Sequence, residues 1–108
     1  MSFNLERKDL EILLKILAED IDKIYAYGSR VKGSASQYSD LDLCFKGNID
    51  KEKIRYFKSQ LRESQLRFKV DLVDWNELSE EFQDLIKADL VKLSPLSQKP
   101  QAQNPNLL

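Results

Sequence analysis

Apolar residues recur at helical spacing near the start of this chain and at strand spacing directly afterwards. Intervals of three and four residues separate the members of one apolar stripe, namely Leu10, Leu13, Leu14, Leu17 and Ile21. This periodicity predicts an amphipathic helix over about residues 5–20. The run Ile24-Tyr25-Ala26-Tyr27 follows and stops at Gly28, which predicts a first strand that ends in a tight turn.

Strand and helix patterns alternate along the rest of the chain. Residues 40–45 and 68–74 predict strands, whereas residues 30–35, 51–64 and 80–91 predict helices, the first of them kept short by Gly33. The two longer helices have apolar stripes formed by Ile54, Phe57 and Leu61 and by Phe82, Leu85, Ile86 and Leu90. We therefore expect an α/β (α+β) fold, a small mixed sheet with helices on one face and an open catalytic face on the other.

The end of the chain has a different composition. All three prolines fall after Ser94, among Gln, Asn and Ser residues, and no apolar periodicity continues there. We expect one domain in residues 1–93 and a flexible tail in residues 94–108, or a tail that becomes ordered on a partner.

The predicted second strand places two carboxylates on one face of the sheet. Side chains alternate along a strand, so Asp40 and Asp42 point one way while Leu41 and Leu43 point the other way. The Cα atoms of the two aspartates would lie roughly 6.5 Å apart. Carboxylates at this separation can bind two divalent ions for displacement at phosphorus, and Mg²⁺ or Mn²⁺ suits such oxygen ligands. Solvated aspartates on an edge strand are the alternative.

The predicted third strand contains two more aspartates, and the alternation of side chains distinguishes them. If Val70 and Leu72 face the core, Asp71 faces the same side as Asp40 and Asp42, whereas Asp74 faces away. Asp71 is therefore the third candidate metal ligand and a candidate general base.

The turn after the first strand is a candidate phosphate site. Gly28 permits a tight backbone, and Ser29 could offer its hydroxyl and backbone N–H to phosphate oxygens or could cap the next helix. Arg30 and Lys32 flank the turn, where they could neutralise a triphosphate or lie as ordinary surface cations.

Four features together resemble the minimal nucleotidyltransferases of the polymerase-beta superfamily. They are Gly28-Ser29, a ten-residue gap, Ser39-Asp40-Leu41-Asp42-Leu43, and Val70-Asp71-Leu72-Val73. The resemblance runs from about residue 25 to residue 75. It is closest to stand-alone proteins, called MNT or antitoxin nucleotidyltransferases, that pair with a helical-bundle protein of the HEPN or substrate-binding type.

This resemblance implies a polymerase-beta-like fold and a magnesium-dependent transfer of AMP from ATP. The implied acceptor is a tyrosine hydroxyl on a HEPN-type toxin, which AMP would silence, so the chain would act as an antitoxin. Two alternatives remain open. One is transfer to a small molecule held by the helical partner, and the other is a binding module that neutralises its partner without catalysis.

Charge and residue usage narrow the function classes further. The chain has 17 Lys and Arg residues against 18 Asp and Glu residues and no polybasic run, so long DNA or RNA is an improbable partner. It has no histidine, which excludes imidazole bases and ligands. The single Cys44 fits a reducing compartment, and no leader or apolar run of membrane length is apparent. We expect a cytoplasmic protein without a membrane segment that forms a hetero-complex, with self-association as a further option.

Three more residues allow either a functional or a purely structural interpretation. Cys44 is in phase with Asp42 and could line the site, although a small buried side chain is the simpler interpretation. Tyr38 and Trp75 could stack on a nucleobase or meet a partner, although packing is the more common role of aromatic residues at strand ends.

Overall fold

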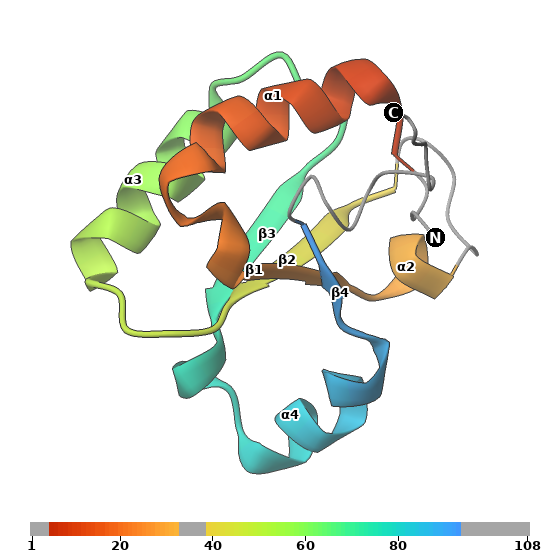
Figure 1. Cartoon of the computed structure of the whole chain (residues 1–108), viewed down its shortest axis with the longest axis vertical. Helices are drawn as coiled ribbons and strands as arrows, with labels where there is room; N and C mark the ends of the chain where they lie inside the picture. Colours follow the sequence, from red (N-terminus) through yellow and green to blue (C-terminus); the bar gives the residue numbers. More distant parts are fainter. Residues whose placement is uncertain (1–4, 33–38, 94–108) are drawn as a thin grey trace, which may run out of the picture.

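A four-stranded mixed sheet forms the centre of the molecule. The computed structural model describes residues 5–32 and 39–93. The strands are β1 (Ile24–Tyr27), β2 (Leu41–Phe45), β3 (Val70–Asp74) and β4 (Val91–Lys92), and they lie in the order β3-β2-β1-β4 (Figure 1). β1 pairs antiparallel with β2 and β4, whereas β2 and β3 are parallel. The prediction of a small mixed sheet is confirmed.

Two helices cover one face of this sheet and enclose the main core. They are α1 (Arg7–Leu17) and α3 (Lys51–Arg62), which lie across the same side of the strands (Figure 1). The predicted stripes supply the contacts, because Leu13 and Leu17 of α1 and Phe57 and Leu61 of α3 are all buried. They pack on the inward side chains of the strands, namely Ile24, Ala26, Leu41, Leu43, Phe45 and Leu72.

The connections set the direction of the strands. α1 runs into a 3-10 segment, η1 (Ala18–Lys23), which leads directly to β1. A single turn of helix, α2 (Ser29–Lys32), follows β1. α3 crosses from β2 to β3, the type of connection that parallel strands require.

The C-terminal part differs from the prediction of one long helix over residues 80–91. A short 3-10 turn, η2 (Trp75–Glu77), precedes α4 (Glu80–Ile86), and the backbone then forms η3 (Lys87–Asp89) and β4. The helix begins where predicted because the Ser79 hydroxyl accepts a hydrogen bond from the N–H of Phe82 at 3.1 Å. It ends early because Val91 pairs with Ala26 of β1.

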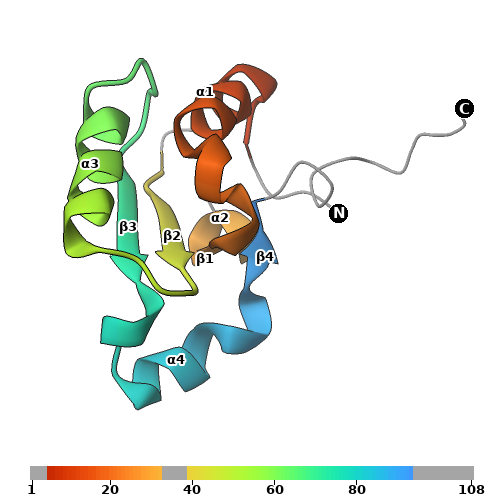
Figure 2. The same cartoon turned by 60° about the vertical axis from the view of Figure 1, so that its left-hand side comes forward.

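α4 limits the open face that was expected opposite α1 and α3. It lies apart from α1 and α3 in both cartoon views (Figure 2). Its Ile86 is buried against Tyr27 and Cys44, which belong to the face opposite the main core. Helix α4 therefore covers part of the second face. Among residues 5–32 and 39–93, no helix is both long and apolar enough to cross a lipid bilayer. The predicted tail, residues 94–108, lies outside the described residues.

Candidate active site

Three polar side chains form a row across the partly covered face of the sheet. Asp42 on β2 is the register partner of Tyr27 on β1 and of Asp71 on β3. Neighbouring strands lie about 4.8 Å apart, so the two aspartates are adjacent although they come from different strands. Asp42 is half-buried and Asp71 is exposed. The structure thus brings together two of the three predicted acids.

Asp40 lies just before β2, with an exposed side chain. It is close enough to Asp42 for its charge to act on that group. Burial raises the pKa of the Asp42 carboxyl, and the negative charges of Asp71 and then Asp40 raise this pKa further. All three acids therefore share one electrostatic environment, at the end of β2 that faces the Gly28 turn.

Gly28 allows the chain to pass directly beside the Asp42 carboxylate. Its φ of 86° is in the left-handed region, which glycine adopts without steric cost. A Cβ at this position would stand 2.6 Å from Oδ2 of Asp42. The backbone turn and the carboxylate are therefore in contact, as a site that binds phosphate and metal together requires.

Ser29 begins α2 directly after this turn, and its side chain is exposed. The carbonyl of Gly28 accepts hydrogen bonds from the N–H groups of Val31 at 3.1 Å and Lys32 at 3.2 Å, which close the single helical turn. Ser29 thus lies at the surface beside Gly28, in a position that is compatible with the predicted phosphate contact.

The chemistry of these residues fits a divalent cation. Burial and the two neighbouring negative charges, those of Asp71 and Asp40, raise the cost of ionising Asp42, and a bound cation would lower that cost. As the side chains stand, no three carboxylate or thiol groups in residues 5–32 and 39–93 are close enough together to hold a metal ion. Binding would therefore require side-chain rotation by the exposed Asp40 and Asp71, while the Gly28 turn confines Asp42.

Arg30 does not lie where the sequence prediction placed it. Its side chain is only 1% exposed, and it extends into the protein instead of toward the surface beside Ser29. Nε donates a 2.9 Å hydrogen bond to the carbonyl of Ser39, and the guanidinium lies 4.1 Å from the centre of the Phe68 ring. The expected surface position is therefore wrong, and a phosphate contact by Arg30 stays a prediction. In a helix of one turn, the sequence does not reveal which side chain turns inward.

Lys32 does lie at the surface. Its Nζ is 3.5 Å from Oδ2 of Asp89 in η3, and its side chain is 61% exposed. This ion pair links α2 to the segment that follows α4. A weak pair at this exposure leaves the ammonium able to exchange partners, so its predicted phosphate contact remains a prediction.

Comparison with known proteins identifies the family of this chain. Residues 11–94 match the family model described as "Polymerase beta, Nucleotidyltransferase". The chain belongs to this family. The nucleotidyltransferase is 36% identical over 91 residues to a curated relative named "Probable protein adenylyltransferase MntA" from Haemophilus influenzae, across 78% of this chain and 77% of the relative. Among solved structures, a candidate nucleotidyltransferase from Sulfolobus solfataricus has a TM-score of 0.44 and 24% identity, with 78% of each chain covered.

The family assignment makes the protein an enzyme, and its remaining candidate residues can be placed around the site. Asp74 faces away from Asp42 as predicted, because its carboxylate caps η2 by accepting a 3.0 Å hydrogen bond from the N–H of Asn76. Trp75 packs against the smaller core cluster, and the Lys46 ammonium lies 4.7 Å from the centre of its ring. Tyr38 is outside the described residues.

Cys44 of the nucleotidyltransferase is a core residue. It is fully buried against Tyr27 and Ile86, and this burial raises the pKa of its thiol to about 11. A neutral thiol beneath the carboxylates is neither a nucleophile nor a metal ligand at physiological pH.

Two residues near the site were not anticipated from the sequence. Tyr27 is 6% exposed beside Asp42, and burial together with the charges of Asp42 and Asp71 raises its pKa to about 12. Asp9 of α1 is 2% exposed and accepts a 2.9 Å hydrogen bond from Nη2 of Arg67. The sequence does contain an indication that Asp9 is buried. It stands four residues before Leu13 and eight before Leu17, on the buried stripe of α1.

Proposed function

We propose that this nucleotidyltransferase transfers AMP from ATP to a hydroxyl group with the help of Mg²⁺. The observation that supports the proposal is the contact between the Gly28 turn and Asp42, with Asp71 next to it on β3. Asp40, Asp42 and Asp71 would hold the metal, and Gly28 and Ser29 would receive the phosphates. Mn²⁺ has the same ligand preference and could replace Mg²⁺.

Each side chain has a separate task in this proposal. When bound, Mg²⁺ offsets the charge of the phosphates and of the leaving pyrophosphate. Gly28 provides a backbone without a side chain at the point of closest approach to the phosphates, and Ser29 donates from its N–H and hydroxyl. Asp71 is exposed at the edge strand of the sheet, where it can accept the proton of an attacking hydroxyl.

We propose further that the hydroxyl belongs to a tyrosine of a HEPN-type partner protein. The name of the Haemophilus influenzae relative refers to protein adenylylation, and this chain matches that relative over most of its length. Asp71 has an exposed side chain on β3, an outer strand of the described sheet, which is compatible with a macromolecular acceptor. Attachment of AMP to the partner would then be the antitoxin step.

The direct test uses the purified chain, its natural helical-bundle partner, Mg²⁺ and ATP labelled on the α-phosphate. We expect label on a partner tyrosine. Asp42→Asn removes a charged ligand without changing shape, so transfer should fall by roughly two or more orders of magnitude. Asp74→Asn is the matched control and should retain near wild-type transfer, because Asp74 faces the other way and Asn can also cap η2.

The outcomes separate the possible functions. Full transfer by Asp42→Asn would show that the Asp42 carboxylate is not the metal ligand that the proposal requires. Label on a free small molecule instead of the partner would replace the protein acceptor with a metabolite. Binding of the partner with no transfer by the wild-type chain would indicate a non-catalytic antitoxin.

A further inference from the structure

The buried Arg30 side chain connects the two ends of the catalytic segment. Residue 30 belongs to α2, one position after Ser29, whereas Ser39 directly precedes Asp40. The 2.9 Å hydrogen bond from Nε of Arg30 to the Ser39 carbonyl therefore joins the phosphate turn to the backbone that presents Asp40. Such a bond from a charged donor is about twice as strong as one between neutral groups.

The Arg30 guanidinium packs on a residue that lies just before β3, namely Phe68. It lies 4.1 Å from the centre of the Phe68 ring, a cation–π distance, and Phe68 is itself buried. The N–H of Leu41 donates to the carbonyl of Lys69 at 2.9 Å, so this same stretch also holds the start of β2. Phe68 thus contacts Arg30 next to the two strands that carry the candidate metal ligands.

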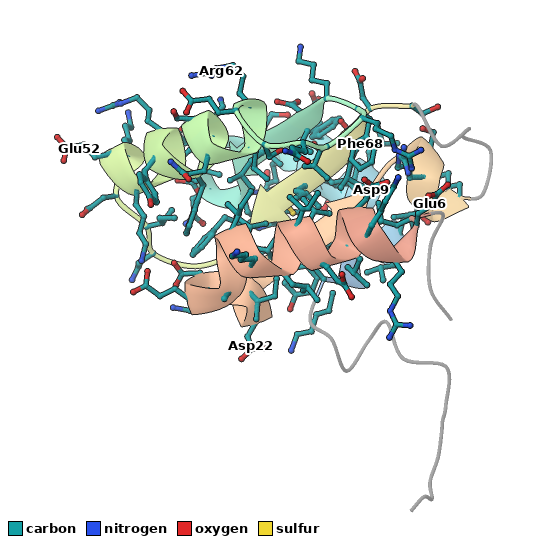
Figure 3. The ribbon with its side chains drawn as sticks, turned by 90° about the horizontal axis from the view of Figure 1, so that it is seen from above. Glu6, Asp9, Asp22, Glu52, Arg62 and Phe68 are labelled. Carbon is teal, nitrogen blue, oxygen red and sulfur yellow. The ribbon has the colours of Figure 1, made fainter. Side chains whose placement is uncertain are left out.

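Helix α1 supplies the compensating charge. Figure 3 shows Asp9, Glu6 and Phe68 together at one end of the molecule, near α2. Asp9 pairs with Arg67, which also lies 2.9 Å from Oε1 of Glu6. Burial lowers the pKa of Arg30, the charge of Asp9 raises it, the charge of Arg67 lowers it, and the charge of Asp40 raises it. Asp9 and Asp40 are thus the negative groups that act on this buried cation, and Asp9 is shared with Arg67.

We propose that Arg30 is a positioning residue that fixes Asp40 relative to the Gly28-Ser29 turn. The inference rests on the proposed function in one respect, namely that Asp40 binds the metal. Arginine suits this role better than lysine because its planar group can stack on Phe68 while Nε donates sideways to a carbonyl. A lysine would keep the charge but would lose this combination of contacts.

The test compares Arg30→Lys with Arg67→Lys, the same substitution in the neighbouring arginine of this cluster. In hydrogen exchange of the metal-free chain, Arg30→Lys should accelerate exchange in peptides covering residues 39–45 by roughly tenfold, as expected for loss of a charged hydrogen bond. Arg67→Lys should lower the melting temperature but leave exchange in these peptides within about twofold of wild type.

A second readout uses the Mg²⁺ concentration that gives half-maximal transfer. Arg30→Lys should raise this concentration by roughly tenfold or more, as loss of an outer contact to a metal ligand does, while KM for ATP stays close to wild type. A purely structural role would lower the amount of folded enzyme without changing the requirement for Mg²⁺. A phosphate-binding role would instead raise KM for ATP.

Phe68→Leu provides a milder variant that retains Arg30 but removes the aromatic ring beneath it. It should change exchange in residues 39–45 in the same direction and by less. Unchanged exchange in both Arg30→Lys and Phe68→Leu would overturn the proposal, as would loss of folding in both. If exchange changes as expected but the wild-type chain transfers nothing, the positioning role stands and the proposed function fails.

Discussion

At the scale of single residues, Gly28 and Asp42 define the closest contact in the site. Gly28→Ala would place a methyl group 2.6 Å from Oδ2 of Asp42 and would force a left-handed φ on alanine. We expect the free energy of unfolding to fall by roughly 1–3 kcal/mol. Transfer should fall by more than this loss explains, because the carboxylate must move. Urea unfolding and an AMP-transfer assay would measure the two effects separately.

Gly47 offers a matched control for the glycine prediction. It also has a positive φ, 151°, and a Cβ there would meet the flexible Lys23 side chain at 3.3 Å. Gly47→Ala should therefore lose stability but keep its activity per folded molecule. If Gly28→Ala lost no more activity than Gly47→Ala, the close contact between the Gly28 backbone and the Asp42 carboxylate would not matter for transfer.

The raised pKa of Asp42 predicts a stability change with a definite sign. Burial is the main cause of the rise, followed by the charges of Asp71 and Asp40. The folded protein binds this proton more tightly than the unfolded chain, so stability decreases as pH rises from the ordinary value near 3.8 through the raised pKa. Without metal, Asp42→Asn should thus melt at a higher temperature than wild type near neutral pH.

This advantage should disappear below about pH 3.8, where Asp42 is protonated in both states. Thermal unfolding with a chelator, at neutral and acidic pH, would measure it. A lower melting temperature for Asp42→Asn at neutral pH would show that the carboxylate stabilises the metal-free fold.

Residue-level prediction succeeded where the alternation of a strand decided the direction of a side chain. Asp71 and Asp74 were assigned to opposite faces in this way, and the register of β2 with β3 and the Asp74 cap agree with that assignment. It did not anticipate the buried position of Arg30, because one turn of helix has no repeated pattern that would reveal its buried side. The pairing of Asp9 with Arg67 spans 58 positions, beyond the reach of any local pattern.

At the scale of elements, β1 was predicted with the bounds that the structure has, because an alternating run ended at a glycine. β4 was missed because it has two residues and exists only through pairing with β1. Leu90 fitted the helical stripe of residues 80–91 equally well, so periodicity extended the predicted helix. Only the tertiary contact of Val91 with Ala26 decides that this segment is a strand.

The residue that directly follows the short β4, Leu93, belongs to the main core. Leu93 is fully buried, and its N–H donates a 2.9 Å hydrogen bond to the carbonyl of Ile24. We expect Leu93→Ala to lower the free energy of unfolding by about 2–5 kcal/mol, through lost burial and the cavity that remains. Leu85→Ala, at a side chain that is 71% exposed, should change it by less than about 0.5 kcal/mol. Equal effects in urea unfolding would contradict this account of β4.

At the scale of the whole molecule, metal binding should stabilise the fold. A cation that binds only the folded protein at tenfold its dissociation constant contributes roughly 1.4 kcal/mol. For a domain of this size, the melting temperature should rise by about 5–10 °C, and by more with ATP present. Differential scanning fluorimetry with and without Mg²⁺ would measure the shift.

Sodium at matched ionic strength should not reproduce the metal effect, because it screens the carboxylates without bridging them. An Asp40→Asn/Asp42→Asn double variant should lose most of the shift. If the variant gained as much from Mg²⁺ and ATP as wild type, the stabilising ion would bind elsewhere.

The parallel pairing of β2 with β3 also has a consequence for biosynthesis. Asp42 and Asp71 are register partners, yet the whole of α3 separates them along the chain. A nascent polypeptide that has emerged only as far as α3 therefore contains the Gly28 turn and two of the acids but not Asp71, the partner of Asp42 on β3. Because parallel strands pair only after their crossover has formed, the acids assemble late. Under the proposed function, an incompletely synthesised or partly unfolded chain would lack one of its three metal ligands, so transfer would begin only after the parallel strands have paired.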